Sequence, residues 1–171
     1  MATTIVSVEE YLHGDYRPDV DYVDGELEDR NLGEDDHSAL QRALLFYFQP
    51  HRSEWSIRVV QEVRMRINAT RYRVPDICVL SLALPKEQIL TRPPLVCIEI
   101  LSPEDRLRRL QARVRDYLEF GVKSVWILDP LEKSGLNCTS PHLADWKQQT
   151  EFSVEGTPIR MELAAVFANV D

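Results

Sequence analysis

The sequence lacks several features that would assign the protein to a special class. No apolar run is long enough to span a membrane. The first residues do not combine a basic start with an apolar stretch, so we expect no secretory signal. The three cysteines form no C-x-x-C pair, which removes support for a cysteine zinc site or a redox motif. We therefore expect a protein of the reducing cytoplasm that neither crosses nor binds a membrane.

Internal repeats and low-complexity segments are also absent, and the chain of 171 residues has the length of one domain. Such a chain can bury a core without disulfide bonds. We predict a single domain over residues 1–171. Within it, 1–35 form an N-terminal helix and hairpin, 36–130 form the core, and 131–171 form a C-terminal hairpin and closing segment.

The charge is unevenly distributed, although the net value of −8 argues against a nucleic-acid partner at first sight. Residues 1–37 hold twelve acids and two arginines, whereas residues 38–129 hold fifteen basic residues and ten acids. Most of these basic residues are arginines, which contact phosphate in a bidentate manner better than lysines do. Surface arginines that only solubilise the protein are the alternative explanation.

Local signals in the N-terminal half predict helices and strands. Ser7 and Glu10 form a capping box at the start of a short helix, and the Asp24-Gly25 dipeptide predicts a hairpin over 21–30. Leucines and a phenylalanine at helical spacing predict a helix that starts near Asp36 and ends before Pro50. Alternating apolar residues predict one strand over 56–67 and a second over 71–80.

The C-terminal half contains two strongly apolar runs, 95–101 and 123–130, which predict strands buried on both faces. Between them, the Ser-Pro-Glu-Asp sequence at 102–105 predicts the start of a helix that ends near Phe120. A strand–helix–strand order predicts a parallel pair with a right-handed crossover. With a hairpin near 146–154, we predict an α/β fold: a three-layer sandwich around a central mixed β-sheet flanked by helices.

Two carboxylates occupy positions that a purely structural role does not explain. Glu99 lies inside the apolar run 95–101, and Asp76 follows Pro75 in another apolar segment. An ionised carboxylate in such surroundings is costly unless it is paired or binds a metal. The alternative is an ion pair with an arginine on a neighbouring strand, and the candidates are Arg64, Arg66, Arg71 and Arg73.

Taken together, the two acids and the basic helix suit hydrolysis of a phosphodiester. Mg²⁺ is usually held by one or two carboxylates together with water and phosphate oxygens. Such a metal lowers the pKa of a bound water and neutralises charge in the transition state. A glycosidase could also use two carboxylates, but that activity would explain neither the arginine-rich helix nor the lack of an aromatic sugar platform.

Four motifs carry a resemblance to a known family: V-P-D-I-C at 74–78, C-I-E-I-L-S-P at 97–103, R-x-x-x-Y at 113–117 and V-W-I-L-D-P at 125–130. They resemble the Uma-type family of restriction-endonuclease-like proteins, within the PD-(D/E)XK nuclease superfamily. The resemblance covers about residues 8–167. It implies a metal-dependent endonuclease acting on DNA, with Mg²⁺ or Mn²⁺ as cofactor.

The resemblance also implies roles for single residues. Asp76 and Glu99 would be the catalytic, metal-binding carboxylates. His37, at the head of the first long helix, resembles a metal-ligating histidine of related nucleases, although a surface position at a helix start is the alternative. Apart from the resemblance, we predict that Arg106, Arg109 and Tyr117, on the helix after Glu99, contact the nucleic acid.

One departure from the family pattern affects the expected activity. Leu101 stands where the superfamily has a lysine two residues after the glutamate, and Arg113 stands where relatives supply a lysine from the next helix. An arginine can clamp phosphate, but it stays protonated and cannot act as a general base. The sequence therefore leaves two hypotheses open, an endonuclease with Arg113 as catalytic cation and a catalytically weak module that binds DNA or protein. A homodimer would suit an enzyme that cuts both strands.

Overall fold

The computed structural model describes residues 5–30 and 34–170, so the parts of the predicted N-terminal region at 1–4 and 31–33, and Asp171, lie outside the described residues. Among the described residues, no helix is long and apolar enough to cross a membrane. The helices are α1 (Val8–His13), α2 (Asp35–Phe48), α3 (Leu107–Phe120) and α4 (Leu163–Phe167), with short 3-10 turns η1 (Gln49–His51) and η2 (Leu143–Asp145). The strands are β1 (Asp21–Val23), β2 (Glu26–Glu28), β3 (Ile57–Gln61), β4 (Met65–Asn68), β5 (Arg71–Arg73), β6 (Ile77–Ser81), β7 (Val96–Ile100), β8 (Ser124–Asp129), β9 (Ser134–Cys138), β10 (Lys147–Gln148), β11 (Glu151–Ser153) and β12 (Arg160–Glu162).

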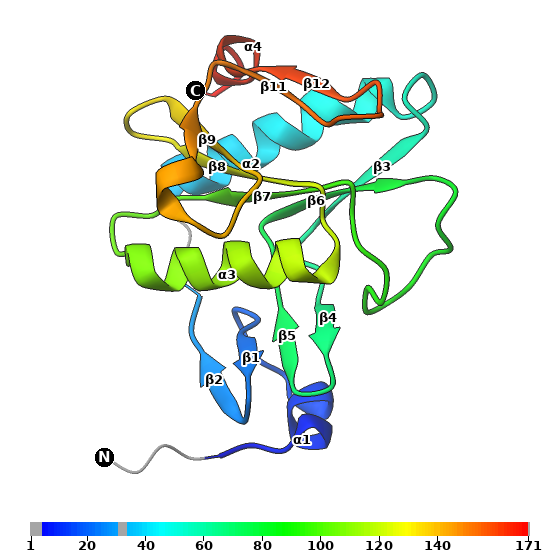
Figure 1. Ribbon diagram of the computed structural model, residues 1–171, viewed down its shortest axis with the longest axis vertical. Helices are drawn as coiled ribbons and strands as arrows, with labels where there is room; N and C mark the ends of the chain where they lie inside the picture. The colour runs from blue at the N-terminus through cyan, green and yellow to red at the C-terminus, as the bar shows by residue number, and fades with distance from the viewer. Residues whose placement is uncertain (1–4, 31–33, 171) are drawn as a thin grey trace.

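A six-stranded mixed sheet with the order β10-β9-β8-β7-β6-β3 forms the centre of the molecule. Strands β7 and β8 are parallel and α3 connects them, whereas the neighbouring pairs in this sheet are antiparallel. Figure 1 shows α2 and α3 on opposite sides of this sheet. The predicted α/β sandwich with a central mixed sheet is therefore confirmed.

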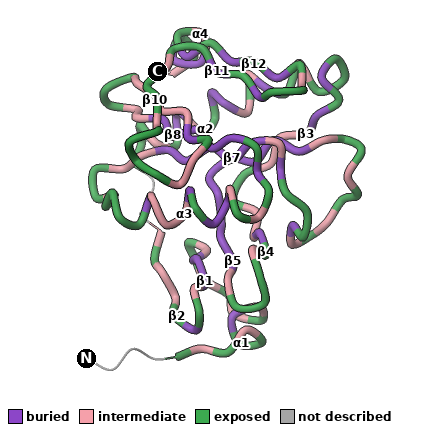
Figure 2. The backbone as a smooth tube through the Cα atoms, viewed as in Figure 1, coloured by how far each residue is buried: buried purple, intermediate pink, exposed green. Residues whose placement is uncertain are grey.

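Each face of the central sheet has its own hydrophobic core. Side chains from α2, α4 and the β11–β12 hairpin pack on one face, against Val96, Ile98 and Ile100 of β7. The helix α3 packs on the other face, where Cys97 of β7 contributes. Strand β7 is buried along its whole length, as Figure 2 shows. Because side chains alternate along a strand, Glu99 lies on the α3 face.

A second, four-stranded sheet with the order β2-β1-β5-β4 extends away from the central sheet, toward α1. The predicted turn at Asp24-Gly25 is confirmed, since both residues have positive φ, 51° and 98°, and join β1 to β2. A small core of tyrosines, with Tyr11, Tyr22 and Tyr72 buried together, fixes α1 to this sheet.

The predicted long strands over 56–67 and 71–80 are each broken in two, so these two predictions were wrong in detail. Glu62 has a φ of 50°, which turns the chain out of β3 and into β4 of the other sheet. Pro75 has no N–H to donate to a ladder, and it lies between β5 and β6. Each strand therefore leaves one sheet and enters the other near the same place, which puts Asp76 at the junction of the two sheets.

Two helix boundaries and one hairpin also differ from the prediction. The crossover helix begins at Leu107 with Arg106 as its N-cap, because Ser102 and Asp105 bond each other in a separate turn. The first long helix starts two residues earlier than a cap at Asp36 would place it, since Glu34 is its N-cap. The hairpin near 146–154 is absent, because β10 pairs with β9 and β11 pairs with β12.

Candidate functional site

The junction of the two sheets fixes the backbone of Asp76. Its carbonyl oxygen accepts a hydrogen bond from the Glu62 N–H at 3.3 Å and one from the Gln41 side-chain amide at 3.2 Å. Glu62 stands at the bend between β3 and β4, and Gln41 projects from α2. The bend after β3 and the helix α2 thus hold Asp76 in place, and its side chain is 6% exposed.

The carboxylate of Asp76 has three partners. Its Oδ2 accepts the backbone N–H of Ile100 at 2.8 Å and lies 3.3 Å from Nε2 of His37, at the start of α2. Its Oδ1 accepts a hydrogen bond from the guanidinium of Arg30. The bond to Ile100 joins Asp76 to the residue that directly follows Glu99, and it therefore brings the two predicted carboxylates to one place.

Glu99 points from β7 toward α3, as the alternation of the strand requires. The Tyr117 hydroxyl donates to Oε1 of Glu99 at 2.5 Å, and Nη1 of Arg113 donates to Oε2 at 3.4 Å. Arg113 and Tyr117 stand four residues apart on α3, so both face the sheet. Arg113 is therefore not a solvated residue of the outer helix face, and its side chain is 13% exposed.

The two carboxylates have opposite pKa shifts. Burial raises the pKa of Glu99 to about 7, and the negative charge of Asp76 adds to that rise against the charge of Arg113. Burial also opposes ionisation of Asp76, but the hydrogen bond from His37 and the charge of Arg30 outweigh it and lower its pKa. Burial disfavours the charged form of His37, yet its hydrogen bond to Asp76 raises its pKa overall. The site therefore keeps the Asp76 carboxylate ionised, whereas the pKa of Glu99 lies close to neutral pH.

Arg113 has a second anchor outside the carboxylate pair. Its Nε donates to Oδ2 of Asp21 at 3.1 Å. Asp21 is fully buried and also accepts from Nη1 of Arg73 at 2.9 Å and from the Val74 N–H at 2.8 Å. Arg73 in turn donates to Asp116 at 2.7 Å and to Glu28 at 2.7 Å. We call Arg73 with Asp21, Asp116 and Glu28 the Arg73 cluster, and its contacts fix the orientation of Arg113.

Among residues 5–30 and 34–170, no group of three or more His, Cys, Asp or Glu side chains is arranged to hold a metal ion. The pair Asp76 and Glu99 nevertheless has the chemistry that a divalent cation needs, namely hard carboxylate oxygens close enough for one charge to raise the pKa of the other. Arg30 and Arg113 supply the positive charge that balances this pair. The donor set therefore fits a divalent cation, provided that an arginine gives way.

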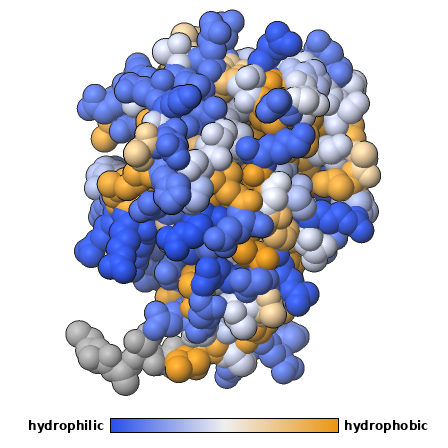
Figure 3. Space-filling view, in the orientation of Figure 1, coloured by the Kyte–Doolittle hydropathy of each residue, from blue (hydrophilic) through white to orange (hydrophobic). Residues whose placement is uncertain are grey.

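The arginines predicted for nucleic acid lie at the surface. Arg106 and Arg109 are exposed at the start of α3, and hydrophilic side chains lie over much of this helix in Figure 3. Tyr117, which the sequence placed with them, is fully buried and bonded to Glu99. Its predicted contact with nucleic acid is therefore corrected, because the side chain has no exposed surface, and its hydroxyl orients the carboxylate instead.

Sequence reasoning missed two residues that touch the site, Arg30 and Asp21. It offered strand arginines as partners for the acids, but the structure pairs Asp76 with Arg30 and Glu99 with Arg113. One signal was available for Arg30, which is the only basic residue between Arg17 and Arg42 apart from His37. No local pattern indicated Asp21, because its partners come from β5 and α3, far along the chain.

Comparisons with known proteins give the family and the fold. The model of the Uma2 family, described as "Putative restriction endonuclease", matches residues 8–166. A search of curated proteins finds no match. A solved structure described as "a putative nuclease belonging to DUF820 from Anabaena variabilis" has 20% identity and a TM-score of 0.81, and the alignment covers 97% of this chain and 99% of that one. It shows a shared fold. A cryo-EM structure of a DrdV–DNA complex has 12% identity and a TM-score of 0.45, with 81% of this chain but 12% of that one covered, which is too distant to support an argument.

Proposed function

The chain belongs to the Uma2 family of restriction-endonuclease-like proteins, and we propose that it hydrolyses phosphodiester bonds of DNA with the help of a divalent metal. One observation carries the proposal: the Ile100 N–H binds Asp76, so that the buried carboxylate before β6 and the buried carboxylate of β7 come together beside two arginines. Asp76 and Glu99 would hold Mg²⁺ or Mn²⁺. A bound metal would lower the pKa of a water molecule and neutralise charge on the phosphate.

The residues around the carboxylates support distinct tasks. Tyr117 keeps Glu99 oriented through its hydroxyl, and Asp21 holds Arg113 so that its guanidinium stays beside Glu99. A fixed cation at this place favours a transition state in which charge builds up on the phosphate. Arg113 acts in this proposal as a catalytic cation and not as a base, since its guanidinium keeps its proton.

The position of His37 next to Asp76 supports its predicted role as a metal ligand. Its Nε2 stands 3.3 Å from Asp76, and the raised pKa favours the protonated ring. In that form His37 orients Asp76, and a neutral ring would be free to serve as a metal ligand. Its ligand role stays a prediction, as do the homodimer, the DNA partner and the cytoplasmic location.

A second function has its own supporting observation. Each carboxylate is already compensated by an arginine, so the site is electrically balanced without a metal. Together with the missing lysine, this balance favours a nuclease-fold protein that is catalytically weak and works by binding DNA or a protein. The two functions differ in whether the purified protein cuts a plasmid or an oligonucleotide with Mg²⁺ or Mn²⁺.

Variants of Arg113 test the proposed enzyme. We expect Arg113→Ala to reduce metal-dependent cleavage of plasmid DNA by about 10²–10³-fold, the cost of removing one donor that acts on the transition state. Mn²⁺ binding, measured by calorimetry, should remain in Arg113→Ala and weaken in Asp76→Asn. Arg113→Lys should retain cleavage because it keeps a cation at the family's position.

Two outcomes would contradict the assignment. Unchanged cleavage by Arg113→Ala would remove Arg113 from catalysis and leave the carboxylates in place. An inactive wild type that also binds no Mn²⁺ would favour the binding protein over the enzyme.

A further inference from the structure

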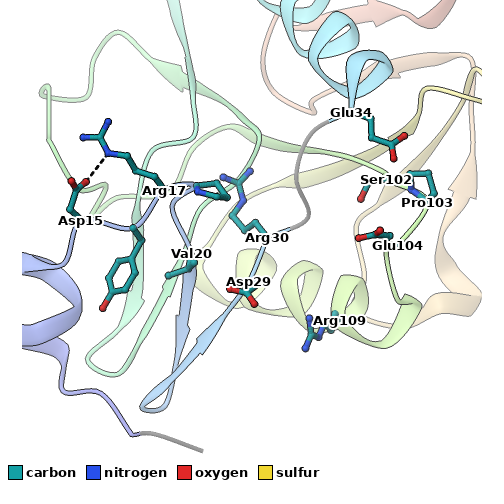
Figure 4. A pocket seen from close by; sticks show the side chains of 12 residues that line it. Asp15, Arg17, Val20, Asp29, Arg30, Glu34, Ser102, Pro103, Glu104 and Arg109 are labelled. Carbon is teal, nitrogen blue, oxygen red and sulfur yellow. Dashed lines mark hydrogen bonds and ion pairs between the residues drawn. The ribbon is translucent and has the colours of Figure 1, made fainter.

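Arg30 lies between the carboxylate site and a cavity at the surface. It follows strand β2, and its guanidinium reaches inward to Oδ1 of Asp76, with 8% of the side chain exposed. Arg30 also lines a cavity of about 890 Å³, together with Arg17, Ser102 and Arg109. Figure 4 shows these side chains around the opening. Arg30 is therefore the cavity-lining residue that the structure places in contact with Asp76.

The two oxygens of Asp76 differ in how firmly they are held. Oδ2 accepts the backbone N–H of Ile100, which is fixed within the central sheet, and also faces His37. Oδ1 accepts from Arg30, a long side chain with several rotatable bonds. An incoming cation would therefore compete with Arg30 for Oδ1 more readily than it would displace the backbone at Oδ2.

The two arginines of the site differ in the acids that they contact. Among the described residues, Arg113 donates to both Asp21 and Glu99, and the side chain of Arg30 donates to Asp76. Burial disfavours the charged form of Arg30, but the negative charges of Asp76 and Glu99 outweigh it and raise the pKa, so the guanidinium keeps its charge whichever partner it has. Adding a dication to this balanced, buried set would leave uncompensated positive charge, which is costly in a low dielectric. Movement of Arg30 away from Asp76 relieves that cost.

We propose that Arg30 exchanges partners: it neutralises Asp76 in the metal-free protein, and it binds a backbone phosphate of the nucleic acid at the cavity once Mg²⁺ or Mn²⁺ is present. This inference rests on the proposed function. The planar fork of a guanidinium suits phosphate as well as carboxylate. The cavity is also lined by four acids, Asp15, Asp29, Glu34 and Glu104. A nucleic-acid strand bound in this cavity therefore depends on contacts with the individual arginines of the lining, and not on a general positive potential.

Metal affinity tests the first half of the exchange. We expect Arg30→Gln to bind Mn²⁺ about tenfold more tightly than wild type in calorimetry, within the usual range of coupling between two sites. Arg17→Gln is the matched control, because Arg17 lines the same cavity but pairs with Asp15, and its Mn²⁺ affinity should equal that of wild type. Arg30→Lys keeps a positive charge, so its Mn²⁺ affinity should lie between those of wild type and Arg30→Gln. This variant keeps the test valid if Arg30→Gln folds poorly.

DNA affinity tests the second half. In an Arg113→Ala background, which limits cutting, Arg30→Gln should weaken binding of a fluorescent DNA duplex when Mn²⁺ is present. It should change binding little in EDTA, since Arg30 is then bound to Asp76. A loss that is equal with and without Mn²⁺ would overturn the exchange, because Arg30 would then contact DNA at all times or act only on folding.

The outcomes separate this inference from the proposed function. If wild type binds Mn²⁺ and Arg30→Gln and Arg30→Lys bind it no more tightly, Arg30 does not compete for Asp76 and the inference fails alone. If neither wild type nor any Arg30 variant binds Mn²⁺, the metal-dependent function fails and the inference fails with it.

Discussion

Two buried groups of acids and arginines lie side by side in this protein, and they differ in how their charges are satisfied. In the Arg73 cluster, one guanidinium bonds three carboxylates at 2.7–2.9 Å. In the site, two carboxylates lie near enough for one charge to raise the pKa of the other, each has its own arginine, and the contact between Arg113 and Glu99 is 3.4 Å. The first arrangement joins β1, β2, β5 and α3 into one unit. The second leaves Glu99 with a pKa raised to about 7, which is typical of a functional site.

Asp21 belongs to both groups, because it accepts from Arg73 and from Arg113. Through Asp21 the structural cluster positions the cation of the site. If this division is correct, changes in the Arg73 cluster should mainly affect stability, and changes at the site should mainly affect pH dependence and ligand binding.

The largest effect is expected from Arg73. Arg73→Met removes a cation that is 2% exposed and leaves the buried acids of its cluster short of positive charge. Removal of one partner from a buried ion pair costs about 3–5 kcal/mol, and we expect a decrease of that size in the free energy of unfolding, measured with urea. Arg108→Met, at an exposed position on α3, is the control and should change it by less than about 0.5 kcal/mol. Equal stability of the two variants would end the distinction between the groups.

An intermediate effect is expected from Glu99 and depends on pH. The pKa of Glu99 rises from 4.5 to about 7 on folding, so the folded protein favours its neutral form. Compared with Glu99→Gln, the wild type should have equal stability below pH 4.5. It should then lose on the order of 3 kcal/mol as the pH rises to 7, at about 1.4 kcal/mol per pKa unit. Urea unfolding in EDTA across this range measures the difference.

The exposed Glu119→Gln on α3 is the control for loss of a negative charge, and its stability should follow the wild-type pH profile. If the difference in unfolding free energy between wild type and Glu99→Gln stays constant from pH 4.5 to 7, the pKa of Glu99 is not raised by folding. The carboxylates of the site would then be charge-compensated like those of the Arg73 cluster.

The smallest effect is expected at the surface of α3, outside both groups. Changing Arg106 and Arg109 to Ala should reduce the slope of log affinity for duplex DNA against log salt by about 0.9 for each phosphate that these arginines neutralise. Stability should hardly change, because both residues are exposed. Arg160→Ala, on β12 at the far end of the molecule from α1 (Figure 1), is the control. An unchanged slope in the double variant would place the nucleic-acid surface elsewhere.

The sequence by itself determined the centre of the fold and the two carboxylates. Apolar runs at 95–101 and 123–130 predicted strands buried on both faces, and the helix between them predicted a parallel pair. The run at 95–101 also identified Glu99 as an acid in an apolar strand. Such an acid needs a partner because burial of an unpaired charge is costly. The lysine missing at Leu101 and the arginine at 113 were equally visible, because motif spacing is local.

Only the tertiary structure decided which charges compensate those acids and where the strands bend. Apolar side chains continue to alternate on both sides of Glu62, so the sequence predicted one strand. In the structure the chain leaves one sheet at Glu62 and enters the other. The hairpin predicted near 146–154 was wrong because β10 pairs with β9 and β11 pairs with β12. Arg30 and Asp21 reach their partners over 46 and 92 positions of the chain. Ion pairs between such distant positions depend on how the sheets meet, and no local spacing encodes them.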